Sequence, residues 1–168
     1  MGELRAYVLP PGALRGLLTP GRRELLEELV RAELPPSPPP RPLGPIWSRV
    51  PGTSVVRPDD PTPADLDLLL DGAEVPPGRA RAAWRLVEAV AAGTATATVR
   101  TRTDRPTGLA PLGLPVPAAD GLEVGSWTLA EAAAHPGLQV GLAGAADRLP
   151  PGPGAGEVVV FWEATAPR

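Results

Sequence analysis

Hydrophobic residues recur at helical spacing in three stretches of the chain. In 19–31 a Thr-Pro pair suits the N-cap and first position of a helix, and one face carries the apolar residues at 25, 26, 29 and 30. A second helix is predicted from Thr62, because Asp65 three positions later can complete a near capping box. The longest helix is predicted over 79–92, with Gly93 as its C-cap. Each of these helices has an apolar face that needs a partner surface.

Elsewhere the hydrophobic pattern is typical of strands. Residues 4–9 are apolar and end at two prolines. In 94–103 the period is two, with alanine, valine and threonine on one side and Thr96, Thr98, Arg100 and Arg102 on the other, which predicts a half-exposed antiparallel strand. The apolar run within 157–163 predicts a strand at the centre of a sheet. A further short strand is expected at 138–142.

Together these elements predict a single α+β domain, with a mixed or antiparallel sheet covered by helices mainly on one face. We expect a βα unit over 1–34 and a main α+β body over 46–168. Between them, the prolines of 35–45 predict an extended connector. The segment 105–120 contains four prolines and is expected to be a long loop. A capping box at 128–131 predicts one more short helix.

Composition removes many catalytic sites. The chain has no cysteine, lysine or asparagine, and His135 is its one histidine. These absences exclude thiolate nucleophiles, Schiff-base lysines, Walker A lysines, cysteine-ligated zinc and three-histidine metal sites. The abundance of Arg, Ala, Gly and Pro indicates a bacterial protein from a GC-rich genome, so arginine or proline content alone does not indicate function. We expect no metal and no cofactor.

Charge and hydropathy bear on partners and location. The formal net charge of −3 gives no general affinity for nucleic acid. Neither a charged-then-apolar leader nor an apolar run near 18 residues occurs in the chain, so a cytoplasmic protein without membrane contact is expected.

Six residues are candidates for a binding site. Arg100, Arg102 and Arg105 could form a row of guanidinium groups for a phosphate or carboxylate, although an ordinary solvated strand face is the simpler explanation. His135 could act as an acid or base, but a histidine at a helix C-terminus is also favoured by the helix dipole. Trp127 and Trp162 could line a pocket, whereas buried tryptophans would simply fill a core poor in other aromatic residues.

A proline-rich motif offers a different kind of site. Pro36, Pro39 and Arg41 fit a PxxPxR pattern, which binds aromatic grooves as a polyproline II helix. Proline is frequent throughout the chain, so the simpler interpretation is a spacer.

These observations favour a non-catalytic cytoplasmic protein that binds a protein partner or itself through its sheet face or its proline-rich segment. One alternative is a small enzyme or an anion-binding protein that uses Arg100, Arg102 and His135. A second alternative is nucleic-acid binding through the arginine strand, which predicts salt-sensitive affinity.

Overall fold

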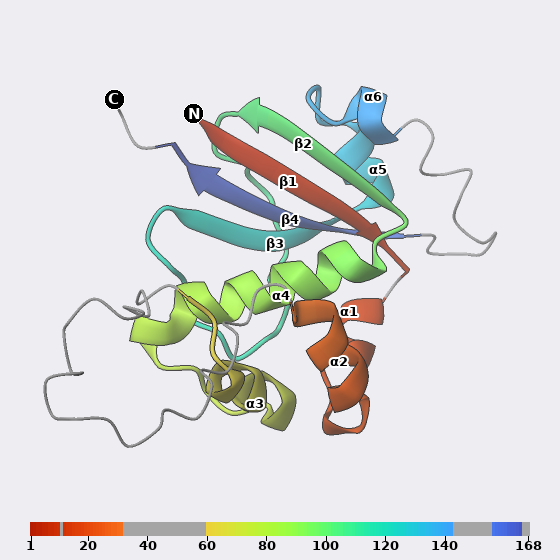
Figure 1. Ribbon diagram of the computed structural model, residues 1–168. Helices are drawn as coiled ribbons and strands as arrows, with labels where there is room; N and C mark the ends of the chain where they lie inside the picture. Colours follow the sequence, from red (N-terminus) through yellow and green to blue (C-terminus); the bar gives the residue numbers. More distant parts are fainter. Residues whose placement is uncertain (11, 32–59, 143–155, 166–168) are drawn as a thin grey trace, which may run out of the picture.

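The structure is a computed structural model that describes residues 1–10, 12–31, 60–142 and 156–165. Its centre is a four-stranded antiparallel sheet in the order β2-β1-β4-β3 (Figure 1). Helices pack against this sheet, so the predicted α+β domain is confirmed. The strands are β1 (Gly2–Leu9), β2 (Ala97–Thr103), β3 (Leu122–Thr128) and β4 (Glu157–Ala164).

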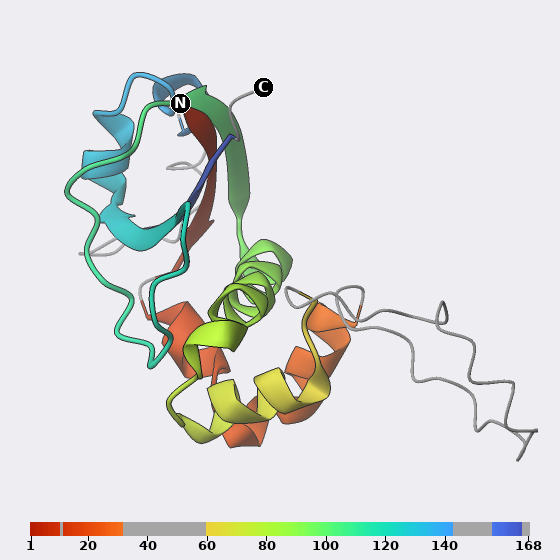
Figure 2. The same ribbon diagram turned by 90° about the vertical axis from the view of Figure 1, so that its left-hand side faces the viewer.

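The helices divide unequally between the two faces of the sheet, as predicted. Figure 2 shows α1 to α4 on one face, and α5 and α6 on the other. The helices of the first face are α1 (Ala13–Leu17), α2 (Arg23–Val30), α3 (Pro63–Asp71) and α4 (Ala80–Thr94), with 3-10 turns at Pro20–Arg22 and Pro77–Arg79. Those of the second face are α5 (Leu129–Ala133) and α6 (Gln139–Leu142). None of the helices in the described segments has the length and hydropathy needed to cross a bilayer.

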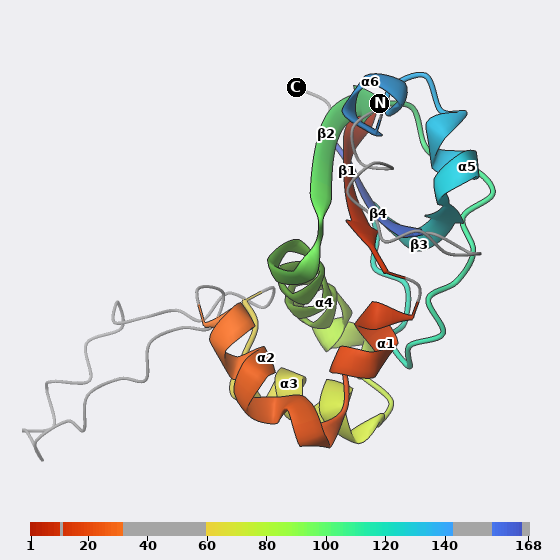
Figure 3. The same ribbon diagram turned by 90° about the vertical axis from the view of Figure 1, so that its right-hand side faces the viewer.

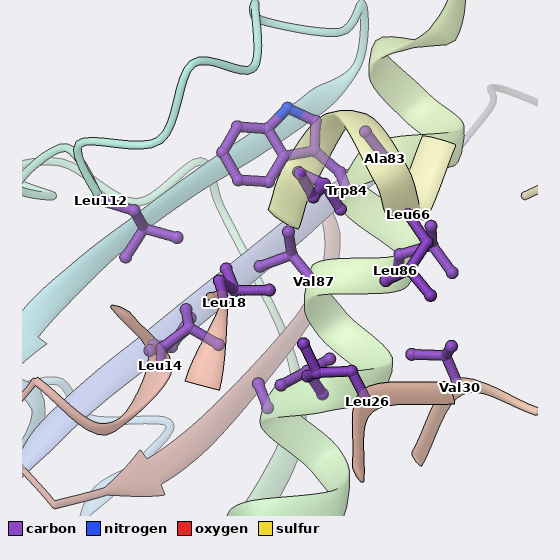
Figure 4. Packing of buried hydrophobic residues seen from close by; sticks show 14 of the residues in the cluster. Leu14, Leu18, Leu26, Val30, Leu66, Ala83, Trp84, Leu86, Val87 and Leu112 are labelled. Carbon is purple, nitrogen blue, oxygen red and sulfur yellow. The ribbon is translucent and has the colours of Figure 1, made fainter. Parts of the chain in front are cut away.

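The larger hydrophobic core lies between the sheet and α4. Tyr7 and Phe161 contribute from the two central strands, and their rings meet edge to face with centroids 5.9 Å apart. From α4, Trp84, Leu86 and Val87 are buried in the same cluster. Figure 4 shows how α1, α2 and α3 add their own apolar side chains around α4. Burying this shared cluster is the main reason these short helices are stable.

A smaller core lies on the opposite face of the sheet. Because side chains alternate along a strand, Leu4, Ala6 and Val8 face this side while Tyr7 faces the other. Trp127 and the residues of α5 and α6 cover them. Strand β4 carries apolar residues on both faces from Val158 to Trp162 and lies between β1 and β3, which confirms the predicted central position of the last strand.

Local capping signals in the sequence correctly located two helix starts. At α5, the Glu131 N–H donates to the Thr128 hydroxyl over 3.2 Å, and the Thr128 N–H donates to the Glu131 carboxylate over 2.9 Å. At α3, the Asp65 carboxylate accepts from both the N–H and the hydroxyl of Thr62. These side chains satisfy donors that a helix N-terminus leaves unpaired.

Two expectations about the elements were wrong, and one strand was missed. Residues 139–142 form α6 rather than a strand, because Leu138 and Leu142, one helical turn apart, both reach the smaller core. Strand β3 was not predicted, since Gly125 and Ser126 interrupt its apolar pattern. Gly93 lies inside α4 rather than at its C-cap; a Cβ there would meet a methyl group of Leu29 at 2.6 Å, so glycine permits α2 and α4 to approach closely.

Replacing Gly125 by alanine is expected to destabilise the fold by about 1–3 kcal/mol, because the loop before β3 packs directly on this glycine. An added Cβ would lie 2.6 Å from the Leu109 Cβ and 2.8 Å from the Ala110 carbonyl oxygen. Urea unfolding should show the loss, whereas Gly78→Ala, where no atom lies within 4 Å of the added carbon, serves as the control. Equal stability of the two variants would contradict this packing.

Candidate functional site

A charged groove lies between α4 and the sheet. The volume of this groove is about 490 Å³. Helix α4 covers only part of this face of the sheet, and the ends of β1 and β2 near the N-terminus extend beyond it (Figure 3). The walls combine apolar surface from Trp84 and Leu122 with four arginines and three glutamates: Arg5, Arg81, Arg85, Arg100, Glu3, Glu88 and Glu163.

Glu88 holds the floor of the groove together. Its carboxylate accepts from Arg5 Nε at 2.5 Å and from Arg5 Nη2 at 3.1 Å, and the Tyr7 hydroxyl donates to the same group at 2.7 Å. Burial raises the pKa of Tyr7, and its hydrogen bond to Glu88 raises it further. Burial works against the charge of Arg5, but Glu88 and Glu163 outweigh it and raise the pKa of this arginine. Tyr7 therefore remains a neutral donor and Arg5 a cation.

Glu163 links the floor to the rim. One carboxylate oxygen lies 3.4 Å from Arg5 Nη1, and the other accepts from Arg81 Nη1 at 2.7 Å. Arg81 also donates to the carbonyl oxygen of Asp120 at 2.5 Å. These charged groups form ion pairs and hydrogen bonds with one another. Their main role is therefore to hold α4, β1 and β4 together rather than to react with a substrate.

The arginines of β2 are much less constrained. The side chain of Arg100 is 71% exposed, and its ion pair with Glu3 is 3.8 Å long. Arg102 is exposed, and in the described part of the chain it forms no ion pair. Across the strand pair, Arg100 lies directly opposite Arg5, so this corner of the sheet carries several positive charges.

The outer edge of β2 also carries unpaired backbone groups. Ala110 and Ser126 exchange both N–H···O bonds on the outer side of β3, at 2.9 and 2.8 Å. In an antiparallel sheet, successive residues of a strand direct their N–H and C=O groups to opposite neighbouring strands. The outward bonds of Ser126, followed through the registers Ser126–Val159, Val159–Tyr7 and Tyr7–Thr98, therefore decide which residues of β2 direct these groups outward. The N–H and C=O groups of Thr98, Arg100 and Arg102 then point away from the sheet. No strand among the described residues pairs with them.

The structure separates the predicted binding residues into two groups. Arg100 and Arg102 share the face of α4, whereas His135 and Trp127 stack on the opposite face with ring centroids 5.5 Å apart. His135 also accepts the Gly137 N–H at 3.2 Å through Nδ1. A pocket that joins His135 to Arg100 and Arg102 is therefore not formed.

The remaining candidates have structural partners or lie outside the described residues. Arg105 follows β2 and forms an ion pair with Glu123. Trp162 is buried, and its Nε1 donates to the Thr103 carbonyl oxygen at 3.1 Å. Trp127 is buried as well. The motif residues Pro36, Pro39 and Arg41, and the connector 35–45 that contains them, lie outside the described residues.

Sequence reasoning missed Arg5, Tyr7 and Glu88. A signal for the first two was present, because Glu3, Arg5 and Tyr7 occupy every second position of the first strand and so share one face. Glu88 gave no signal, since its contact with β1 spans more than 80 residues of chain.

Two aspartates of α3 pair with arginines. Asp65 binds Arg79 with both oxygens, and Asp67 lies 2.5 Å from Arg23. Among the described residues, no group of three or more His, Asp or Glu side chains is placed to hold a metal ion.

No family model, no curated protein and no solved structure matches this chain. The chemistry of the groove and of the β2 edge therefore has to indicate the function.

Proposed function

We propose that this chain is a non-catalytic protein-interaction module that binds an extended segment of a partner protein along β2. The observation that carries this proposal is the outer edge of β2, where Thr98, Arg100 and Arg102 direct their backbone N–H and C=O groups away from the sheet. A partner segment in extended conformation would pair with these groups as a fifth strand.

The residues of β2 suit strand addition. Along its seven residues, Thr98, Arg100 and Arg102 on one side alternate with alanine, valine and threonine on the other. The β-branched side chains among them favour an extended backbone. The exposed arginines also limit uncontrolled pairing, because charged side chains on an edge strand oppose aggregation. Such an edge can pair with a partner strand of complementary side chains and disfavours pairing with other strands.

The groove supports a binding role over a catalytic one. Glu88 accepts from Arg5 and Tyr7, and Glu163 from Arg5 and Arg81, so both carboxylates are engaged in contacts that stabilise the fold. His135 lies on the opposite face of the sheet.

Amide hydrogen exchange on the full chain tests the proposal. The probes are soluble extended peptides of about eight residues, in which β-branched residues alternate with acidic, basic or neutral polar residues. In the free protein the amides of Thr98, Arg100 and Arg102 should exchange quickly, whereas those of Val99 and Thr101 should be protected. At least one peptide should slow exchange at the three outward amides.

A proline substitution provides the matched variant. Thr98→Pro removes an outward N–H without breaking a bond to β1, which an edge strand tolerates. It should weaken peptide binding by about tenfold, the loss of roughly one well-made backbone hydrogen bond, whereas Thr98→Ala should bind nearly as well as the wild type. The proposal is wrong if no peptide protects the outward amides, or if both variants bind alike while remaining folded.

A small carboxylate or phosphate ligand in the groove is a second candidate, favoured by the exposed guanidinium of Arg100 and its long ion pair with Glu3. Titration with succinate or inorganic phosphate should then shift the NMR signals of Arg100 and Arg85, and Arg100→Gln should abolish the shift. Absence of any shift at low salt would remove this candidate.

A further inference from the structure

We infer that the partner segment is acidic, with carboxylate side chains at every second position on the groove side of β2. This inference rests on the proposed function, because it specifies which extended segment the edge accepts.

The geometry of β2 places its arginines beside any strand added to this edge. Arg100 and Arg102 direct their backbone groups outward, and their side chains lie on the face of the sheet that α4 partly covers. Neighbouring residues of paired strands share a face, so every second residue of an added strand would lie beside these guanidinium groups. This holds for a parallel or an antiparallel partner.

The charges beside the edge of β2 favour an acidic partner. Arg5, Arg100 and Arg102 gather at this corner, and Arg5 already binds Glu88. Glu3 lies opposite Arg102 in the strand pairing but makes its ion pair with Arg100, at 3.8 Å. Arg5 pairs with Glu88 and Glu163, but Arg100 has only the 3.8 Å contact with Glu3, and Arg102 has no ion pair among the described residues. Carboxylates on an added strand would supply these two arginines with partners, whereas lysines at the same positions would be repelled by them.

The opposite face of the added strand has a different neighbourhood. Ala97 and Val99 are half-buried and pack against the smaller core, and α6 lies against β2 on this side. The intervening residues of the partner should therefore be small or β-branched apolar residues. The expected segment alternates an acidic residue with valine, threonine or alanine.

Charge also disfavours a second copy of this chain on the same edge in the two registers that bring arginines together. In a symmetric antiparallel pair centred on Arg100, the two Arg100 side chains would lie opposite each other. A pair centred on Thr101 would place Arg100 of each copy opposite Arg102 of the other. Both arrangements set like charges side by side without adding a carboxylate on that face.

Three peptides of about eight residues test the inference: alternating Glu with Val and Thr, the same peptide with Gln for Glu, and the same with Lys for Glu. A fourth peptide has the composition of the first but groups its Glu residues at one end. Fluorescence anisotropy should show the alternating Glu peptide binding about tenfold more tightly than the Gln peptide and the grouped peptide, and the Lys peptide most weakly. Raising the salt from about 0.05 M to about 0.5 M should reduce this preference.

Charge reversal in the protein supplies the matched test. The double variant Arg100→Glu, Arg102→Glu changes exposed side chains, so its fold should persist, and it should prefer the Lys peptide. The inference is overturned if the Glu, Gln and Lys peptides bind equally and all protect the amides of Thr98, Arg100 and Arg102, a result that would leave the proposed function standing. Binding of the Glu peptide without protection of these amides, and without loss in Thr98→Pro, would overturn both. A dimer in sedimentation whose formation protects the same amides would overturn the inference in favour of self-pairing.

Discussion

Replacing Arg79 by methionine is expected to destabilise the protein by about 3–5 kcal/mol, because it leaves a buried carboxylate without its cation. Asp65 is 2% exposed, and Arg79 binds both of its oxygens, at 3.0 Å through Nε and at 2.6 Å through Nη2. Arg79 also donates to the Asp60 carbonyl oxygen at 2.7 Å. The same carboxylate caps α3 through Thr62, so its disturbance would affect the start of that helix.

The contribution of Asp65 to stability depends on pH. Burial favours the neutral form of Asp65, but the hydrogen bonds from Arg79 and Thr62 outweigh burial and lower the pKa of this carboxyl. The stabilisation is therefore complete above the pKa of the unfolded chain, about 3.9, and is lost as the pH falls through the lower pKa of the folded protein. In Arg79→Met, the loss of stability on acidification should begin at a higher pH than in the wild type.

Urea unfolding at neutral pH measures the effect against two controls. Arg22→Met removes an exposed arginine and should cost less than about 0.5 kcal/mol. The double variant Arg79→Met, Asp65→Asn should be more stable than Arg79→Met alone, since no unpaired buried charge remains. Equal stability of Arg79→Met and Arg22→Met would show that the pair does not stabilise the fold.

The elements that the sequence predicted correctly are those with local causes. The capping boxes at Thr62 and Thr128 involve residues three positions apart, and each marks a helix start in the structure. The alternation in β2 has one exposed and one half-buried side as predicted, because the contrast between its arginines and its alanine and valine is present within the strand itself.

The features that escaped prediction depend on contacts between distant segments. Leu25 was expected on the buried face of its helix, yet it is 41% exposed, because α2 turns Leu26, Leu29 and Val30 toward α4 and the core instead. The strand order makes β2 an edge, so that among the described residues no strand pairs with the outward backbone groups of Arg100. The arginine row was visible in the sequence, whereas its separation from His135 by the thickness of the sheet was not.

Alkaline titration is expected to destabilise the protein through a single side chain. The chain has one tyrosine and no lysine or cysteine, so between about pH 9.5 and pH 12 no side chain other than that of Tyr7 should titrate. The raised pKa of Tyr7 keeps its hydroxyl protonated in the folded state, while the unfolded chain loses this proton at about pH 10. Tyr7 therefore makes its full contribution to stability below about pH 10. Above that pH the free energy of unfolding should fall by about 1.4 kcal/mol for each pH unit, or by about 2.7 kcal/mol at about pH 12.

Tyr7→Phe separates this titration from general alkaline damage. The variant loses the hydrogen bond to Glu88, which should cost about 1 kcal/mol at neutral pH, but its stability should be nearly constant over the alkaline range. Tyrosinate absorbance in the ultraviolet reports the ionisation directly, and Glu88→Gln should move the midpoint toward the ordinary value of 10.0 because it removes a negative charge beside the phenol. A wild-type midpoint near 10, or the same alkaline loss in Tyr7→Phe, would contradict the buried Tyr7–Glu88 contact. The groove floor would then be open to water, and Arg5 would be free to compete with Arg100 for an acidic partner.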